Sequence, residues 1–312
     1  MVRLFINHNV LKVGKFENVP FSNPNWCREL HQFEPLVARF TRDMRLFMAK
    51  KKVSAKVISQ KILADGIYDL RLETKITEEA VPGQFVGVYT NDKSSLLPRP
   101  ISICGVNKEK NELRLVYRVV GKGTDLFSKL SEGDEVDVFG PLGNGYPMEE
   151  AAGKTAILMG GGIGVPPLLE MAKRLSQLPD NKRPKAVKIV MGYRNDQTFL
   201  ADEFRKYGDL YIATDDGSLG THGTVIDALN EQNIEGDVIY TCGPMPMLRG
   251  IKKYAAEHNM KAYLSLEERM ACGVGACLGC VVKTKDVDAH SHVNNARICT
   301  DGPVFDAEDV DI

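Results

Sequence analysis

Residues 155–167 read TAILMGGGIGVPP. An apolar run that enters a glycine-rich turn and is followed by a helical stretch predicts a strand, a loop and a helix. We expect the strand over Thr155–Met159 and the helix over Pro167–Gln177. The loop departs from the Gly-x-Gly-x-x-Gly pattern because Val165 is at the last position, so a tight structural turn is an alternative to a pyrophosphate site. The candidate ligand-binding residues of this loop are Gly160, Gly161, Gly162 and Gly164.

The segments that follow repeat the pattern of an apolar strand and a helical stretch. This alternation predicts a parallel, doubly wound sheet, whose ligands bind at the carboxyl ends of the strands. Cys242 and Gly243 close one of these strands, so they are expected either beside a nicotinamide or as a plain strand cap. The expected elements are strands over Ala186–Gly192, Leu210–Thr214 and Val238–Thr241, and a helix over Met245–His258.

Before the loop, from residue 53 to about residue 142, short segments alternate in polarity or are rich in β-branched residues. Gly, Asn, Asp and Pro separate them, and this texture predicts a small antiparallel β-barrel. The expected strands are Val53–Ser59, Ile67–Glu73, Gln84–Tyr89, Ile101–Val106, Glu112–Val120 and Glu135–Phe139.

Two groups of residues in the predicted barrel are candidates for binding phosphate. Arg99 begins the sequence Arg99-Pro100-Ile101-Ser102, and a guanidinium can bind a phosphate through two parallel hydrogen bonds. Gly121–Thr124 precedes the amphipathic stretch Asp125–Leu130, which suits a phosphate at a helix N-terminus. Taken alone, an Arg-Pro turn is more often structural, and Gly-x-Gly-Thr is commonly a turn with a helix cap.

The C-terminal part of the chain contains the sharpest signal, a set of four cysteines. Cys272, Cys277 and Cys280 have the spacing Cys-x4-Cys-x2-Cys, and Cys299 follows after eighteen residues. This is the plant-type ferredoxin spacing for a [2Fe-2S] cluster, and the intervening glycines allow the loop to curl around the sulfurs. A structural zinc site and merely buried cysteines are the alternatives.

An iron-sulfur cluster carries one electron at a time, whereas a nicotinamide exchanges a hydride. A chain with both sites needs a carrier that can do either, and a flavin is such a carrier. We therefore expect a flavin site in the barrel.

The chain is long enough for several domains. We expect an extension of doubtful status, most simply disordered, over residues 1–47, a FAD-binding β-barrel over 48–150, an NAD-binding α/β domain over 151–262 and a [2Fe-2S] module over 263–312. Patterned sequence begins only after Met48, so translation starting there is a competing explanation of the extension. A partner-specific arm is another.

Composition argues against several classes of partner. The formal net charge of −1 gives no long-range attraction to nucleic acid or to anionic lipid. The longest uncharged stretch, residues 155–169, is shorter than the roughly 20 residues that cross a bilayer. An odd cysteine count and the lack of a signal peptide pattern favour the cytoplasm. We expect no nucleic-acid partner and no membrane partner.

Taken in order, these motifs resemble those of a known superfamily. Residues 53 to about 262 resemble the ferredoxin-NADP reductase superfamily. The whole span 53–312 resembles the electron-transfer subunits of type B dihydroorotate dehydrogenases. The closer resemblance rests on the sequences LEERMACGVGACLGC at 266–280 and ICTDGPVF at 298–305.

The resemblance implies a cofactor for each module. Arg99 would bind the FAD phosphates, and Ser102 would lie near the flavin ring. It implies no general acid or base in this chain. The implied FAD-binding residues are Arg99, Pro100, Ile101, Ser102, Val116, Tyr117, Arg118, Gly123 and Thr124. The implied NAD-binding residues are Gly160, Gly161, Gly162, Gly164, Cys242 and Gly243, and the implied cluster ligands are Cys272, Cys277, Cys280 and Cys299.

The resemblance also implies a partner. A catalytic, FMN-containing dihydroorotate dehydrogenase subunit would pass electrons through the [2Fe-2S] cluster and FAD to NAD, in a heterotetramer with two copies of each subunit that serves pyrimidine synthesis.

Two other functions remain open at this point. One is an NAD(P)H-ferredoxin-type reductase or a sulfide dehydrogenase or transhydrogenase subunit with a different redox partner. An aspartate replaces a cluster cysteine in some of those relatives, whereas all four positions are Cys here. The other is a zinc-stabilised interaction module with no catalytic role. Asp215 and Asp216 can disfavour the 2'-phosphate of NADP by repulsion, or they can simply form a turn before Gly217.

Overall fold

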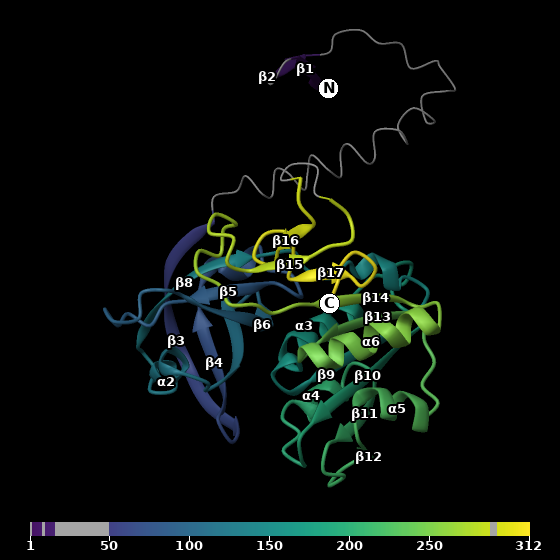
Figure 1. Cartoon of the computed structure of the whole chain (residues 1–312). Coiled ribbons are helices and arrows are strands. Elements are labelled where there is room, and N and C mark those ends of the chain that lie inside the picture. Colours follow the sequence, from purple (N-terminus) through teal and green to yellow (C-terminus); the bar gives the residue numbers. More distant parts are fainter. Residues whose placement is uncertain (1, 8–9, 16–49, 288–291) are drawn as a thin grey trace. The chain divides into compact units, whose positions relative to one another are not determined.

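The computed structural model of the chain describes residues 2–7, 10–15, 50–287 and 292–312 (Figure 1). The chain divides into two units, residues 1–49 and 50–312. In the first unit, β1 (Val2–Asn7) and β2 (Val10–Lys15) pair antiparallel. The predicted extension over 1–47 and the alternative start at Met48 fall largely outside the described residues.

The second unit begins with a closed barrel in the strand order β3-β4-β7-β6-β5-β8, and all its pairings are antiparallel. Each of the six predicted strand segments overlaps one of these strands, so the predicted barrel is confirmed. The barrel elements are β3 (Lys51–Ala64), β4 (Ile67–Glu73), η1 (Lys75–Glu78), β5 (Phe85–Val88), β6 (Arg99–Asn107), β7 (Glu112–Arg118), α2 (Lys122–Phe127) and β8 (Glu135–Leu142).

The barrel encloses its own apolar core. Leu70 and Leu72 of β4 and Leu113 and Leu115 of β7 alternate along their strands and are almost fully buried in this core. Such alternation places every second side chain on the inner face of a strand. Phe127 of α2 is part of the same core, so this short helix closes the barrel.

A seven-stranded sheet follows, in the order β12-β11-β10-β9-β13-β14-β17. All of its pairings are parallel except β14 with β17, so the predicted doubly wound sheet is confirmed. The elements are η2 (Met148–Ala151), β9 (Thr155–Gly161), η3 (Gly162–Gly164), α3 (Pro166–Ser176), β10 (Ala186–Tyr193), α4 (Ala201–Phe204), β11 (Asp209–Thr214), β12 (Thr221–His222), α5 (Val225–Glu231), β13 (Val238–Cys242), α6 (Met245–Glu257), β14 (Lys261–Ser265) and β17 (Val304–Asp306).

Both faces of the sheet are covered. On β9, Leu158 belongs to the core that contains α3, whereas Ile157 and Met159 belong to the core that contains α5 and α6. A strand buried on both faces has an almost continuous apolar sequence, and this explains the run that precedes the glycine loop. Ile67 and Val116 of the barrel strands, and Tyr146 after β8, join the α3 core, so the barrel packs against the sheet through an apolar contact.

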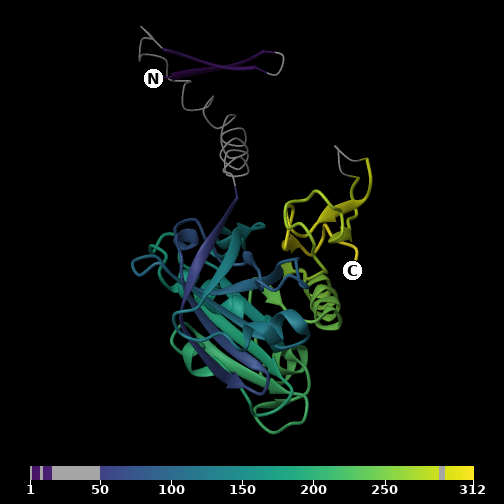
Figure 2. The same ribbon diagram turned by 90° about the vertical axis from the view of Figure 1, so that its left-hand side faces the viewer.

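The C-terminal segment leaves the sheet and returns to it. After β14 the chain forms the cysteine loop and the hairpin of β15 (Val281–Lys283) and β16 (Asn295–Arg297), and then adds β17 at the sheet edge. Figure 2 shows this segment beside the barrel. The predicted boundary between residues 262 and 263 falls inside β14, and the strand continues across it.

Charged side chains fix α3 and α4 against the barrel. Glu170 of α3 accepts a hydrogen bond from the Val106 amide at 3.0 Å. Arg114 of β7 donates to Asp69 of the barrel and to Glu203 of α4, with N–O distances of 3.0 and 2.6 Å. The Arg114 and Asp69 side chains are 9% and 4% exposed, so this pair is shielded from water, whereas Glu203 is 39% exposed.

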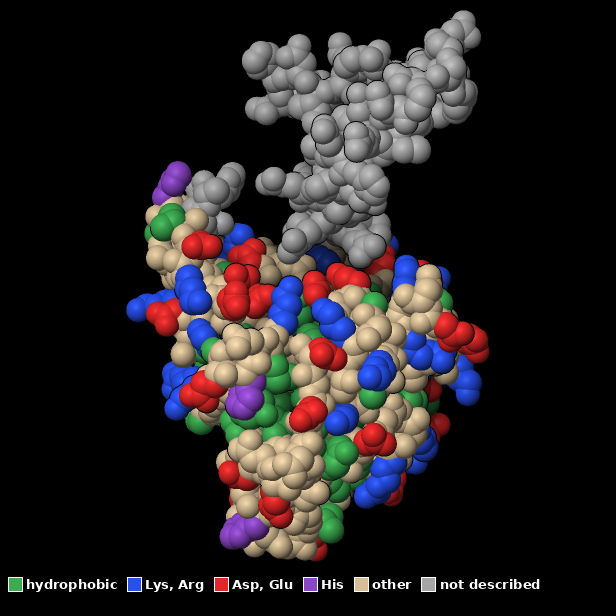
Figure 3. Space-filling view, turned by 90° about the vertical axis from the view of Figure 1, so that its right-hand side faces the viewer, with side chains coloured by type: hydrophobic (Ala, Val, Ile, Leu, Met, Phe, Trp, Pro, Cys, Tyr) green, Lys and Arg blue, Asp and Glu red, His purple; other side chains and the backbone are tan. Residues whose placement is uncertain are grey.

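Within the described residues, no helix is long and apolar enough to cross a membrane. On the face shown in Figure 3, acidic and basic side chains are interspersed, in agreement with the small net charge.

We predict that Arg114→Met lowers the stability of the second unit. Removing the guanidinium leaves Asp69 buried beside only the more distant Arg71, and breaking a buried ion pair costs about 3 kcal/mol or more. The thermal unfolding midpoint should fall by about 5–10 °C. Arg183→Met, which removes a solvent-exposed pair with Asp180, is the control and should change the midpoint little. Equal midpoints for the two variants would contradict the prediction.

Candidate redox site

The structure brings the four cysteines together as two pairs. The Cys272 thiol contacts that of Cys277, and the Cys299 thiol contacts that of Cys280. A two-iron cluster needs two thiolates on each iron, so the arrangement fits a [2Fe-2S] cluster. Among the described residues, no three His, Cys, Asp or Glu side chains are gathered as ligands of a single metal ion.

Backbone amides of the loop point at the sulfurs. The Cys272 sulfur accepts from the amides of Val274 and Cys277, each at 3.4 Å, and the Cys299 sulfur accepts from the Gly275 amide at 3.2 Å. Burial opposes ionisation of Cys272, but these amides bring the pKa of its thiol down to about 7. Burial and the neighbouring Cys280 raise the pKa of Cys299 to about 12. Amide donors favour the thiolate form that metal ligation needs.

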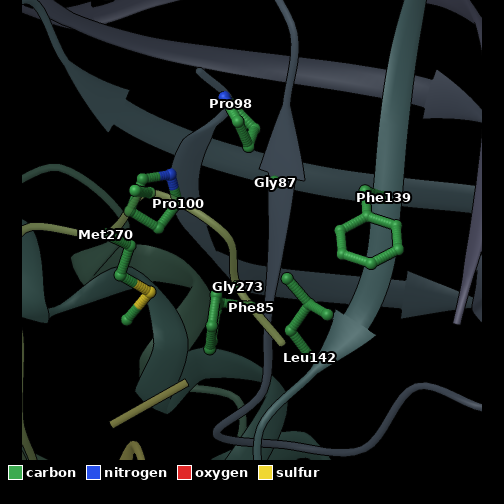
Figure 4. A pocket seen from close by; sticks show the side chains of 9 residues that line it. Phe85, Gly87, Pro98, Pro100, Phe139, Leu142, Met270 and Gly273 are labelled. Atoms are coloured by element: carbon green, nitrogen blue, oxygen red, sulfur yellow. The ribbon is translucent and has the colours of Figure 1, made fainter. Parts of the chain in front are cut away.

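The cysteine loop rests on the barrel. A Cβ on Gly273 would lie 3.2 Å from Leu142 and 3.8 Å from Phe139, both on β8. Figure 4 shows the small apolar pocket at this junction, with Met270 and Gly273 of the loop facing barrel side chains. Its lining is Phe85, Gly87, Pro98, Pro100, Phe139, Leu142, Met270, Ala271 and Gly273. The predicted residue Pro100 therefore adjoins the cysteine loop.

The two predicted phosphate-binding groups of the barrel are also neighbours. A Cβ on Gly123 would lie 2.7 Å from Arg99 Cζ, so the guanidinium of Arg99 packs directly on this glycine. The same guanidinium donates to Ser95 Oγ at 2.6 Å and to the Leu97 carbonyl. These contacts orient Arg99 at the edge of the barrel, where its strand is only partly buried.

Three of the predicted flavin-binding residues of the barrel have side chains that are turned into the protein or that shape a loop. Val116 and Tyr117 are 3% and 2% exposed, and the Tyr117 hydroxyl donates to Gln60 at 2.9 Å. Their side chains are therefore buried in the protein interior and do not face a ligand site. Thr124 Oγ1 accepts from the amides of Val120 and Gly121 and shapes the loop rather than facing outward. α2 has only six residues, which is too short for its N-terminus alone to indicate a phosphate site.

The glycine loop 160–164 meets the end of β13. A Cβ on Gly164 would lie 2.6 Å from Gly243 Cα, and one on Gly161 would lie 3.2 Å from Pro244. On the other side, Arg118 of the barrel is 3.6 Å from the Cβ position of Gly162. The predicted groups around Arg118, the loop and Cys242-Gly243 therefore converge at the carboxyl edge of the sheet.

Sequence reasoning missed the polar residues that surround Cys242. Ser265 of β14 lies opposite Cys242 in the strand register and hydrogen-bonds its thiol, while burial raises the pKa of Cys242 to about 12. The Tyr146 hydroxyl donates to the Thr241 carbonyl at 3.1 Å. Burial, with a contribution from Cys242, raises the pKa of Tyr146 well above its ordinary value. No local motif marks Tyr146 or Ser265, because only the fold brings them to this edge.

An antiparallel barrel, a doubly wound sheet and a set of four cysteines beside the barrel define an oxidoreductase of the ferredoxin-reductase type with an added iron-sulfur module. Residues 267–311 match the family described as the iron-sulfur cluster binding domain of dihydroorotate dehydrogenase B, and residues 158–253 match the oxidoreductase NAD-binding domain.

A curated relative from Bacillus cereus (strain B4264), the electron transfer subunit of dihydroorotate dehydrogenase B (NAD(+)), is 44% identical over 259 residues. The match covers 82% of this chain and 96% of the relative. The chain belongs to the family of dihydroorotate dehydrogenase B electron transfer subunits.

Solved structures agree with this fold. The structure of an NADH-dependent reduced ferredoxin-NADP oxidoreductase, reported in connection with flavin-based electron bifurcation, has a TM-score of 0.72 and 29% identity. It covers 82% of this chain and 89% of its own. A flavohemoglobin from Malassezia yamatoensis, at 17% identity and a TM-score of 0.57, covers 77% of this chain and 67% of its own. At that identity the similarity concerns the fold alone.

We predict that Gly164→Ala disturbs the carboxyl edge of the sheet. The new methyl group would meet the backbone of Cys242 and Gly243, which cannot rotate away as a side chain can. Overpacking of this kind costs about 1–3 kcal/mol, and affinity for a nicotinamide dinucleotide should fall as well. Thermal unfolding and dinucleotide titration measure the two effects. In Gly105→Ala the methyl group makes only an ordinary 3.4 Å contact with Arg114, so this control should match the wild type in both.

Proposed function

We propose that this chain passes electrons from the FMN of a catalytic dihydroorotate dehydrogenase subunit, through a [2Fe-2S] cluster and FAD, to NAD in pyrimidine synthesis. The observation that carries the proposal is that one barrel contacts both other sites: Pro100 of the Arg99 strand lines a pocket with the cysteine loop, and Arg118 lies 3.6 Å from the Cβ position of Gly162 in the glycine loop. When bound, the flavin supplies the step between one-electron and hydride chemistry. Family membership supports the identity of the substrate.

The roles of this chain's residues follow from their positions. Arg99, oriented by Ser95 and packed on Gly123, provides a fixed cation for the FAD phosphates. The open backbone of the Gly160–Gly164 loop lies where a dinucleotide approaches the sheet edge. The proposed FAD-binding residues are Arg99, Pro100, Ile101, Ser102, Val116, Tyr117, Arg118, Gly123 and Thr124. Val116 and Tyr117 would contribute through their backbone, because their side chains are buried.

The proposed cluster ligands are Cys272, Cys277, Cys280 and Cys299, and the proposed NAD-binding residues are Gly160, Gly161, Gly162, Gly164, Cys242 and Gly243. No side chain of this chain is assigned as a general acid or base. The chain instead positions the groups and excludes water. The proposed domains are 48–150 for FAD, 151–262 for NAD and 263–312 for the cluster.

The preference for NAD is attributed to the loop after β11. Asp215 and Asp216 lie exposed at the carboxyl end of this strand. Asp216 is engaged by the amide and hydroxyl of Ser218 at 2.9 and 2.6 Å. Two carboxylates at this position repel the extra phosphate of NADP.

The surface around the cysteine loop suits a protein partner. Val274, Leu278 and Val281 are 47%, 63% and 38% exposed, although apolar side chains of this size are usually buried. The catalytic subunit is proposed to dock there, in a cytoplasmic heterotetramer with two copies of each subunit.

A second candidate is a ferredoxin-linked NAD(P)H reductase subunit. The 29% identity and 0.72 TM-score with the NADH-dependent reduced ferredoxin-NADP oxidoreductase favour it. The redox partner distinguishes the two candidates.

The decisive experiment uses Cys277→Ser in the complex reconstituted with the catalytic subunit. The variant should lose the cluster but keep FAD, because the ligand lies in the loop and not in the barrel. Iron and flavin analysis measure this. Electron flow from dihydroorotate to NAD should be abolished, while NADH-dependent reduction of an artificial acceptor at the flavin continues. Ser54→Ala, on an exposed part of β3, is the control and should behave as wild type.

Three results would overturn the proposal: wild-type flow in a variant shown to lack its cluster, dihydroorotate oxidation by this chain alone, or no dihydroorotate-dependent flow in the wild-type complex. Reduction of ferredoxin in place of dihydroorotate-linked flow would favour the second candidate.

We also predict that Arg99→Ala weakens FAD binding. A charge-assisted hydrogen bond to phosphate contributes about 1.5–3 kcal/mol, or roughly ten- to a hundredfold in affinity. Gly123→Ala should act in the same direction, since its methyl group would displace the Arg99 guanidinium. Fluorescence titration of the apoprotein with FAD measures both. Unchanged affinity in both variants would assign Arg99 a structural role.

A further inference from the structure

The fourth cysteine reaches the site by a different route from the other three. Cys272, Cys277 and Cys280 share one loop, whereas Cys299 follows the β15–β16 hairpin. Its position relative to the barrel therefore depends on tertiary contacts. Inside the module, the Ile298 amide donates to the Cys280 carbonyl at 2.9 Å. That bond orients Cys299 toward the other ligands but leaves its placement on the barrel to other groups.

A compact turn follows Cys299. The Arg297 carbonyl accepts from the amides of Thr300 and Asp301 at 3.1 and 2.7 Å. The Arg297 guanidinium also pairs with the Asp301 carboxylate at 3.0 Å. The backbone of residues 297–302 thus forms a closed unit, and Cys299 lies inside it. Whatever holds this turn also holds the ligand.

Asn144, in the segment after β8, holds this turn. Its side-chain amide donates to the Thr300 and Asp301 carbonyls at 3.0 and 2.9 Å. Its backbone amide donates to the Gly302 carbonyl at 2.6 Å. The two carbonyls bound by the side chain come immediately after Cys299, so a single residue joins the end of a barrel strand to the turn that bears the ligand.

The neighbouring backbone leaves little freedom for this contact to shift. A Cβ on Gly143 would lie 2.5 Å from Pro303 Cδ and 2.7 Å from the Gly302 carbonyl. Gln84 of the barrel donates to the Gly143 carbonyl at 2.7 Å. Phe139 and Leu142 of β8 also lie near Gly273, in the loop that carries the other three cysteines. The end of β8 and the segment after it therefore contact both segments that carry the proposed ligands.

We propose that Asn144 is a positioning residue that fixes Cys299, and with it one side of the cluster, at a set distance from the flavin-binding barrel. This inference rests on the proposed function. A group held by neighbours that are themselves hydrogen-bonded keeps its geometry more narrowly than one on a free loop. Because the rate of electron transfer falls steeply with the distance between centres, Asn144 determines how fast flavin and cluster exchange electrons.

The test is Asn144→Asp in the full-length, cofactor-loaded protein. Aspartate has the shape of asparagine but no side-chain N–H. It places a carboxylate against the two carbonyl oxygens of Thr300 and Asp301. Asn144→Ala is the second variant, which removes the hydrogen bonds without adding repulsion. Asn107→Ala is the matched control, because the Asn107 side chain accepts from the Lys110 amide in the exposed β6–β7 turn.

Three measurements separate positioning from general folding. Flavin reduction by NADH should keep its wild-type rate in both Asn144 variants, whereas cluster reduction, followed by its own absorbance under anaerobic conditions, should slow. Iron release to a chelator should accelerate roughly twenty-five-fold, at about fivefold for each of two lost hydrogen bonds. Hydrogen exchange should rise in residues 297–302.

Two outcomes would overturn the inference. One is that both variants match Asn107→Ala in cluster reduction and in iron release. The other is that both variants lose FAD together with the cluster, which would make Asn144 a general structural residue. A wild-type protein that binds no cluster would instead refute the proposed function, so the two failures are distinguishable.

Discussion

The contact between the segment after β8 and its surroundings is the constraint on which the second unit depends. Asn144 binds the turn after Cys299, and two residues later the Tyr146 hydroxyl donates to the carbonyl of Thr241 near the carboxyl end of β13. Residues 143–146 thus connect the barrel with the parallel sheet and with the segment that carries the cysteines. The glycines in this segment are required by space, since a Cβ on Gly145 would lie 2.8 Å from Val81.

Rigid placement suits a protein whose proposed task is to move electrons between fixed centres. The shared core of barrel and sheet and the buried Arg114 network prevent the modules from moving as independent domains. The backbone amides directed at Cys272 and Cys299 also contribute to rigid placement at the proposed cluster site. They stabilise negative charge on sulfur without any movement of side chains.

Much of the fold was predictable because the hydrophobic pattern of each strand agrees with the burial that the whole fold gives it. The strand of residues 155–159 is apolar on both faces because helices cover both faces. The barrel strands alternate because only one face is inside. What was missed comes from contacts distant in sequence. The addition of β17 antiparallel to β14, whose paired residues are 39 or more positions apart, has no local signature. The burial of Val116 and Tyr117 likewise depends on which neighbours pack against β7.

The sequence by itself determined the kinds of site, since cysteine spacing and glycine loops express chemistry and backbone requirements within a few residues of one another. Four cysteines at ferredoxin spacing predict an iron-sulfur centre from local sequence, with a structural zinc site as an alternative. Only the tertiary structure decided how these sites relate. The packing of Arg99 on Gly123, of Gly164 on Gly243 and of Asn144 on the Cys299 turn joins segments between 20 and 160 residues apart. Such contacts form only when the whole chain has folded, because their partners are selected by shape and hydrogen bonding rather than by proximity in sequence.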